Sequence, residues 1–256
     1  MSENKGVCCF SSILTACKEK MDKTYFIIPA YNESEAIRQV LEEWYPVVER
    51  CGQESRLVVI DDGSRDNTYA ILTEFAQTHP LVVPVTKPNG GHGATILYGY
   101  RHALQQGADY IFQTDSDGQT DPAEFPAFWE QRKEYDMVIG YRNKRQDGLS
   151  RIFVTKVLKL VILLCFGANV KDANTPFRLM KAETLAKYMD LIPEDYFLTN
   201  VLISVIYQKK KCRVKYMPIT FRPRQGGVNS INMKRIQKIG RQAWHDFRVI
   251  RKSIDR

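Results

Sequence analysis

Two stretches of the chain share one pattern: Thr24-Tyr-Phe-Ile-Ile-Pro-Ala-Tyr-Asn-Glu33 and Arg56-Leu-Val-Val-Ile-Asp-Asp-Gly-Ser64. In each, a short apolar run rich in β-branched residues ends in polar turn residues, which is typical of a buried strand that enters a loop. Residues 34–50, between them, have the apolar spacing of an amphipathic helix. A strand, a helix and a second strand in this order predict a unit with parallel strands.

The same alternation continues to about residue 145. We predict strands over 24–29, 56–61, 81–86, 110–115 and 137–141, and helices over 34–50, 67–78, 94–106 and 122–134. This order predicts an α/β fold in one domain, with a Rossmann-like, mostly parallel sheet flanked by helices on both faces. Ligands of such sheets bind beyond the carboxyl ends of the strands, so we expect the chemistry in the loops that follow them.

The pattern becomes less regular in the C-terminal part. We predict helices over 151–166 and 196–207, and strands over 175–180 and 213–221. Met233–Ile254 places apolar residues three or four positions apart among basic ones, which predicts a basic amphipathic C-terminal helix. We expect its apolar stripe to pack on the domain, with a lipid surface as the alternative. The predicted organisation is a disordered leader over 1–23, a domain over 24–232 and this helix over 233–256.

Composition and charge exclude several classes of protein. The 256 residues are 44% hydrophobic and 26% charged, which excludes collagen, a coiled coil and wholesale disorder. Residues 1–128 carry 10 Lys+Arg and 18 Asp+Glu, a net charge of −8, whereas residues 129–256 carry 27 and 11, a net charge of +16. The basic half suits an anionic partner. We expect no nucleic acid, because no nucleic-acid-binding motif is present and Lys209-Lys-Lys211 ends a predicted helix, where cations complement the helix dipole.

Cysteine spacing and hydropathy indicate the compartment. The six cysteines lack the paired spacing of a zinc site, and we expect reduced thiols. Lys156 and Lys159 interrupt the apolar stretch 152–170, which argues against a spanning helix. The first twenty residues are not a signal peptide, although acylation of Cys8 and Cys9 is an alternative to a disordered leader. We therefore expect a cytoplasmic protein, held peripherally at the cytoplasmic face of a membrane.

Polar residues follow four consecutive predicted strands. They are Tyr31 and Glu33, then Asp61 and Asp62, then Lys87 and Gly90, and then Asp115, Asp117 and Gln119. Each motif alone is a common turn or helix cap, but parallel strands bring all four to one edge. Asp115, Asp117 and Gln119 offer the oxygen ligands that Mg²⁺ or Mn²⁺ takes together with substrate phosphates. The glycine-rich loop after Lys87 lets backbone approach an anion closely, but it is not the P-loop of a nucleoside triphosphatase.

Taken in order, these motifs resemble family 2 glycosyltransferases of the GT-A fold. The matching runs are Ile27-Ile-Pro-Ala-Tyr-Asn-Glu33, Asp61-Asp-Gly-Ser-x-Asp-x-Thr68, Asn89-x-Gly-x-Gly93 and Asp115-x-Asp117. Gly140-Tyr-Arg142, Asp172-Ala-Asn-Thr-Pro-Phe-Arg178 and Phe221-Arg-Pro-Arg224 extend the resemblance to the branch of dolichyl- and polyprenyl-phosphate sugar transferases. It implies an inverting, metal-dependent transfer of a hexose from a GDP- or UDP-sugar to a polyprenyl phosphate.

The resemblance also implies a role for each matching residue. The donor would be held by Pro29, Tyr31, Glu33, Ile60, Asp62, Lys87, Gly90 and Arg224, and the metal by Asp115, Asp117 and Gln119. The acceptor phosphate would be received by Arg142, Arg151, Thr155 and Arg178, with Arg142 also near the donor phosphates. Asp115, Asp117, Arg142 and Asp172 are the expected catalytic residues. The sequence departs from the family after Arg224, where Ile231 follows Ser230 in place of a basic residue.

The nature of the acceptor decides whether a base is needed. A phosphate monoester is already ionised at neutral pH, whereas a sugar hydroxyl must lose its proton to a nearby carboxylate. Glu194, Asp195 and Asp172 are the candidate bases, and the first two are equally good as helix-capping residues. We favour a polyprenyl phosphate acceptor, with the hydroxyl of a cell-surface glycan as the alternative. A membrane subunit is a further partner that this interpretation allows.

Overall fold

The computed structural model describes residues 22–142, 149–168, 170–223 and 233–254; for 149–156, 233–241 and 243 it describes the backbone alone. Its strands are β1 (Thr24–Ala30), β2 (Arg56–Asp61), β3 (Val82–Thr86), β4 (Tyr110–Gln113), β5 (Met137–Arg142), β6 (Arg178–Lys181) and β7 (Val214–Ile219). Its helices are α1 (Ile37–Arg50), α2 (Thr68–Thr78), α3 (His92–Gln105), α4 (Phe125–Glu130), α5 (Leu149–Phe166), α6 (Ala182–Ala186), α7 (Thr199–Lys209) and α8 (Met233–Ile254), with 3₁₀ turns η1 (Pro122–Glu124) and η2 (Met189–Leu191).

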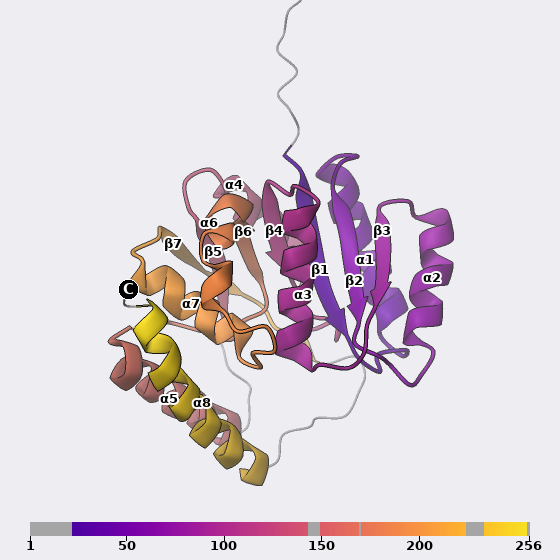
Figure 1. Cartoon of the computed structure of the whole chain (residues 1–256). Helices are drawn as coiled ribbons and strands as arrows, with labels where there is room; N and C mark the ends of the chain where they lie inside the picture. The colour runs from indigo at the N-terminus through magenta and orange to yellow at the C-terminus, as the bar shows by residue number, and fades with distance from the viewer. Residues whose placement is uncertain (1–21, 143–148, 169, 224–232, 255–256) are drawn as a thin grey trace, which may run out of the picture.

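The strands form one sheet in the order β3-β2-β1-β4-β6-β5-β7 (Figure 1). β1 pairs in parallel with β2 and β4, β2 with β3, and β5 with β7, whereas β6 is antiparallel to both β4 and β5. The prediction of a mostly parallel sheet is therefore confirmed. Because one reversed strand separates β4 from β5, the carboxyl ends of all the parallel strands meet at one edge, together with the start of β6.

Each face of the sheet is covered by its own hydrophobic core. On one face, side chains of α3, α5, α7 and α8 pack on alternate strand residues such as Ile27, Ile60 and Ile111. On the other, α1, α2 and α4 pack on the intervening residues, among them Phe26 and Phe112. The period of two that separates these sets is that of a pleated strand buried on both sides. The predicted three-layer α/β arrangement is confirmed.

Local chemistry explains where the elements differ from the prediction. The predicted helix over 122–134 is replaced by η1 and the six-residue α4, and Pro126, which has no amide hydrogen, falls in the first turn of α4. β4 ends at Gln113, two residues early, so Asp115 lies in the loop. The short helix α6 and the turn η2 were not predicted.

The helix pair α5 and α8 extends from the core of the domain. Phe166 and Phe247 join them, with ring centroids 5.1 Å apart. Figure 1 shows the pair side by side at the end of the sheet to which the parallel strands point. Within the residues described, no helix combines the length and apolar character needed to cross a bilayer.

Candidate active site

The loops after β1 and β2 are joined by reciprocal hydrogen bonds. The Asn32 amide donates to Ser64 Oγ (2.9 Å), and the Arg65 amide donates back to Asn32 Oδ1 (2.8 Å). Asn32 has φ = 53°, a left-handed conformation that asparagine tolerates better than most residues. The Glu33 amide donates to Thr68 Oγ1 (2.9 Å). The backbone around Tyr31 and Glu33 is therefore fixed at the sheet edge.

Asp66 ties the same loops to two helices. Its carboxylate accepts from the Thr68 amide (3.0 Å) at the start of α2 and from the Ser34 amide (3.1 Å) ahead of α1. Burial opposes ionisation, but these hydrogen bonds and that of the Thr68 hydroxyl lower the pKa of Asp66. Asp66 therefore holds the two loops against the starts of α1 and α2.

Asp62 joins the end of β2 to the glycine-rich loop. Its carboxylate accepts from the amides of Gly90 (2.9 Å) and Gly91 (2.8 Å) and forms an ion pair with Lys87. Burial alone would raise the pKa of Asp62, but the hydrogen bonds from Lys87 and Gly90 outweigh it and the pKa is lowered. The Asn89 amide group donates to the Asp62 carbonyl (2.9 Å). Asp62, Lys87 and Gly90 therefore come together, as predicted, but they bind one another.

Asp115 and Asp117 lie in the loop after β4, at the same edge. Asp115 Oδ1 is buried and has no hydrogen-bond partner within the described part of the chain. Asp117 Oδ1 accepts the Gln119 amide (3.1 Å), which holds the loop around Gly118. With the side chains as they stand, no group of three or more His, Cys, Asp or Glu residues within the described ranges is close enough together to hold a metal. Two carboxylates with one unpaired buried oxygen nevertheless fit a divalent cation whose other ligands come from substrate and water.

The segment after β7 closes against this loop. Thr120 forms an antiparallel bridge with Phe221, and the Arg222 amide donates to the Gln119 carbonyl (2.7 Å). The Gln119 side-chain amide donates to the Arg222 carbonyl (3.2 Å), which leaves its oxygen for another partner. Arg142, at the end of β5, stacks its guanidinium 4.0 Å from the centroid of the Phe221 ring. The guanidinium of Arg142 and the loop that carries Asp115 and Asp117 therefore lie on the same side of the candidate site.

His92 is a residue of the edge that the sequence interpretation did not select. It begins α3, and its Nε2 lies 3.8 Å from Asp115 Oδ1. The only sequence signal was a histidine inside the glycine-rich loop of a strand end. Its proximity to Asp115 depends on the β1–β4 pairing, which brings two distant loops together.

Two predicted contacts do not fit the burial of the side chains. Ile60 is fully buried in the core beneath α3, so its side chain does not face a nucleoside at the edge. Arg178 is also fully buried, and its guanidinium donates to the carbonyls of Ala173, Thr175 and Asn200 at 2.6–3.2 Å. Because these backbone groups take its donors, the predicted contact of Arg178 with an acceptor is not supported.

Arg178 is instead a buried cation below the carboxylate loop. Burial lowers its pKa, whereas the negative charges of Asp172 and Asp115 act in the opposite direction. Arg178 pairs in register with Gln113 of β4, two residues before Asp115. Asp172 is buried as well. This position favours a structural role for Asp172, in which its buried charge supports that of Arg178.

The side chains of three predicted site residues lie outside the described part of the structure. Arg224 lies outside the described residues, as does the departure at Ile231. Arg151 and Thr155 belong to the first turns of α5, where only the backbone is described. Pro29 is buried within β1, one residue from the loop that carries Tyr31.

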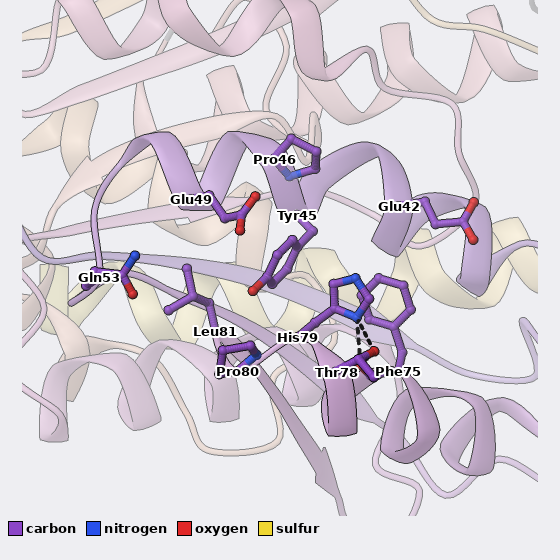
Figure 2. Close-up of a pocket in the computed structure, with 10 residues that line it drawn as sticks. All are labelled: Glu42, Tyr45, Pro46, Glu49, Gln53, Phe75, Thr78, His79, Pro80 and Leu81. Atoms are coloured by element: carbon purple, nitrogen blue, oxygen red, sulfur yellow. Dashed lines mark hydrogen bonds between the residues drawn. The ribbon is translucent and has the colours of Figure 1, made fainter.

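A separate hollow of about 560 Å³ lies near the amino ends of β2 and β3. Tyr45 of α1, Phe75 of α2 and His79 form its aromatic floor, and Glu42 and Glu49 stand at its rim (Figure 2). The rings of Phe75 and His79 stack with centroids 3.7 Å apart. The hollow contains none of the predicted donor, metal or acceptor residues, and we assign no part of the candidate site to it.

The chain resembles known proteins in both sequence and fold. The sequence profile described as Glycosyl transferase family 2 matches residues 25–189. The undecaprenyl-phosphate 4-deoxy-4-formamido-L-arabinose transferase of Proteus mirabilis (strain HI4320) is 32% identical over 164 residues, 62% of this chain and 49% of that protein. The protein of the same name from Klebsiella pneumoniae (strain 342) is 26% identical over 218 residues, 84% of this chain and 64% of that protein. The chain spans less than two thirds of the length of these relatives.

Solved structures of low sequence identity share the fold. Glucosyl-3-phosphoglycerate synthase from Mycobacterium tuberculosis, in complex with UDP, superposes with a TM-score of 0.64 at 16% identity, over 90% of this chain and 80% of that one. A crystal structure of that enzyme with Mn²⁺, UDP-glucose and phosphoglyceric acid gives a TM-score of 0.61 at 17% identity, over 86% and 77%. Residues 1–349 of S. aureus TarS give 0.52 at 17%, over 76% and 58%. These likenesses confirm the GT-A type of fold.

Proposed function

Because the chain belongs to glycosyl transferase family 2, we propose that it transfers a sugar from a nucleoside-diphosphate sugar to a polyprenyl phosphate at a membrane surface. The observation that carries the proposal is the shared edge at which Asp115, Asp117 and Arg142 meet. Carboxylates suit a cation on the donor diphosphate, and an arginine suits a phosphate acceptor. The names of the curated relatives, which specify undecaprenyl phosphate, agree with this division.

The donor half of the proposal rests on rigid loops. Tyr31 is partly exposed on the β1 loop that Asn32 and Ser64 hold in place, and a nucleoside can stack on such a ring. Asp115, Asp117 and the oxygen of Gln119 would hold Mg²⁺ or Mn²⁺. A bound cation would supply a Lewis acid that offsets the negative charge developing on the departing diphosphate. The fixed carboxylates avoid the cost of reorganising during the reaction.

The acceptor half of the proposal rests on the positions of the candidate bases, which are engaged elsewhere in the fold. Glu194, a candidate base for a hydroxyl acceptor, pairs with Arg101 at 3.3 Å. Arg101 lies nine residues beyond His92 on α3, about 13 Å along the helix from the sheet edge. Asp172 is buried, and its charge acts on that of Arg178. A phosphate monoester needs no base, so the site favours a phosphate acceptor over a hydroxyl acceptor. Attack from the side opposite the diphosphate would then invert the configuration of the anomeric carbon.

The α5–α8 pair offers a surface for a lipid-borne acceptor. Leu160, Leu163 and Leu164 of α5 are 55%, 50% and 60% exposed, and Trp244 and Val249 of α8 are 41% and 58% exposed. Arg248 and Lys252 of α8 are also exposed. Apolar side chains beside cations suit the interface of an anionic bilayer. α5 begins seven residues after Arg142 in the sequence, so the helix that carries these leucines follows the proposed acceptor residue along the chain.

A direct assay of product tests the proposal. The purified chain is incubated with radiolabelled UDP- and GDP-sugars, polyprenyl phosphate vesicles and Mg²⁺ or Mn²⁺. We expect label in an organic-soluble product that mild acid releases, and no product when EDTA is present. A parallel reaction with a free glycan acceptor tests the alternative. Label that enters only the glycan would reject the lipid phosphate as acceptor.

A further inference from the structure

His92 and Asp115 come from different loops and face each other at the sheet edge. His92 Nε2 lies 3.8 Å from Asp115 Oδ1, and that oxygen has no hydrogen-bond partner within the described residues. The His92 side chain is about half exposed, at 55%, so one side of the ring is open to solvent. A distance of 3.8 Å is too long for a direct hydrogen bond. The two side chains therefore face each other without being bonded to one another.

The backbone that carries His92 is held on both sides. Before it, the amides of Gly90 and Gly91 are bound by the Asp62 carboxylate. After it, the Gly93 carbonyl accepts the Thr199 hydroxyl at 3.0 Å. A Cβ at position 93 would lie 2.5 Å from the Phe197 carbonyl oxygen, so only glycine allows α3 to approach this closely. The position of His92 is thus set by the fold, and only its side-chain torsions remain to adjust.

The separation of the two atoms is close to that of two ligands on one cation. Adjacent ligands of an octahedral ion, each roughly 2.1 Å from the metal, lie about 3 Å apart. The His92 and Asp115 atoms need to approach by less than about 1 Å, which a change in side-chain torsion supplies. Imidazole is a good ligand for transition metals, whereas Mg²⁺ prefers oxygen ligands.

We propose that His92 is a nitrogen ligand of the metal held by Asp115 and Asp117, and that it makes the site select Mn²⁺ over Mg²⁺. The inference rests on the metal dependence of the proposed function and adds to it a residue and a preference. Gly91, with φ = 85°, and Gly93, packed against the Tyr196–Phe197 backbone, fix where α3 and His92 begin at the sheet edge. The cation is thus bound from two strand ends, those of β3 and β4.

Electron paramagnetic resonance of bound Mn²⁺ tests the inference without an activity assay. In the wild-type chain with Mn²⁺ and UDP, and separately with GDP, we expect nitrogen coupling in the spin-echo spectrum that changes on labelling with ¹⁵N-histidine. His92→Ala should remove the coupling and weaken Mn²⁺ binding at least tenfold, while Mg²⁺ binding changes less than about twofold. His92→Asp should also lose the coupling but bind Mg²⁺ more tightly, because it substitutes an oxygen ligand.

Controls separate failure of the inference from failure of the metal site. His245→Ala removes an exposed histidine of α8 and should leave the coupling and both affinities unchanged. Circular dichroism verifies that each variant is folded. Coupling that persists in His92→Ala, or wild-type Mn²⁺ binding without coupling, overturns the role of His92 but leaves the carboxylate site intact. Absence of Mn²⁺ binding by the wild-type chain overturns both the inference and the proposed metal dependence.

Discussion

The Oδ2 atom of Asp62 lies 2.8 Å from the backbone nitrogen of Gly91, which joins the loop after β2 to the loop that begins α3. The Gly90 amide and Lys87 complete the partners of this carboxylate. A carboxylate that accepts backbone amides ahead of a helix also complements the helix dipole. Asp62 thus organises the donor side of the edge whether or not it contacts a nucleoside.

Replacement of Asp62 should lower stability in a way that depends on pH. Its folded-state pKa lies below the ordinary value of 3.8, so its contribution is present above that pH and is lost as the pH falls through the folded-state pKa. At about pH 7 we expect Asp62→Asn to lower the free energy of unfolding by roughly 1–3 kcal/mol. Urea unfolding of both proteins at several pH values should show the difference narrowing below about pH 4. Asp190→Asn, at an exposed position, serves as the control; a difference that widens in acid would contradict the assignment.

Asp115 and Asp117 should matter for turnover far more than for folding. Asp115→Asn and Asp117→Asn should each reduce kcat by about 100-fold or more, because a charge that stabilises the departing diphosphate is lost. Denaturation midpoints should stay near wild type, since Asp115 Oδ1 has no hydrogen-bond partner to lose in the described structure and an asparagine oxygen at position 117 can still accept the Gln119 amide. The measurement is metal-dependent transfer by purified variants beside Asp190→Asn. Full metal-dependent activity in either variant would remove these residues from the metal site.

Substitution of Arg178 should affect mainly stability, whereas substitution of Arg142 should affect mainly acceptor binding. Arg178→Met should lower the free energy of unfolding by roughly 3–5 kcal/mol, because the carbonyls of Ala173, Thr175 and Asn200 lose a buried donor. Arg142→Met should cost about 1 kcal/mol, the value of its contact with Phe221, and should raise KM for the lipid phosphate. Chemical denaturation and acceptor titration separate the two effects. A stable Arg178→Met protein with weak acceptor binding would restore Arg178 to the acceptor site.

The exposed leucines of α5 should determine binding to lipid. The double variant Leu160→Ser, Leu164→Ser should sediment with anionic vesicles at least tenfold less than wild type, because apolar area no longer enters the interface. Arg248→Gln with Lys252→Gln should weaken binding at low salt only, by about 1 kcal/mol per charge. Tyr98→Ser, on the exposed side of α3, is the matched control. Equal sedimentation of all these proteins would exclude α5 as the contact.

Much of the fold followed from local pattern. The apolar runs at residues 24–29 and 56–61 form buried strands, and Met233–Ile254 forms a helix with the predicted bounds. The prediction of one helix over 122–134 was wrong, because apolar spacing does not show where one helical turn stops and the next begins. The antiparallel direction of β6 could not be predicted from the sequence either, since a short apolar run looks the same in a parallel and an antiparallel pair.

Local sequence is enough to predict which chemical groups the protein brings to one edge, because parallel strands present their carboxyl ends together and each of the first four predicted strands ends in polar residues. How those groups are used depends on the way the chain packs in three dimensions. Arg178 and Ile60 are buried by helices packed above them, Asp62 is bound by amides from another loop, and His92 reaches Asp115 across the β1–β4 pairing. Burial and partnership depend on contacts between segments far apart in the chain, and a local pattern of residue types does not contain them.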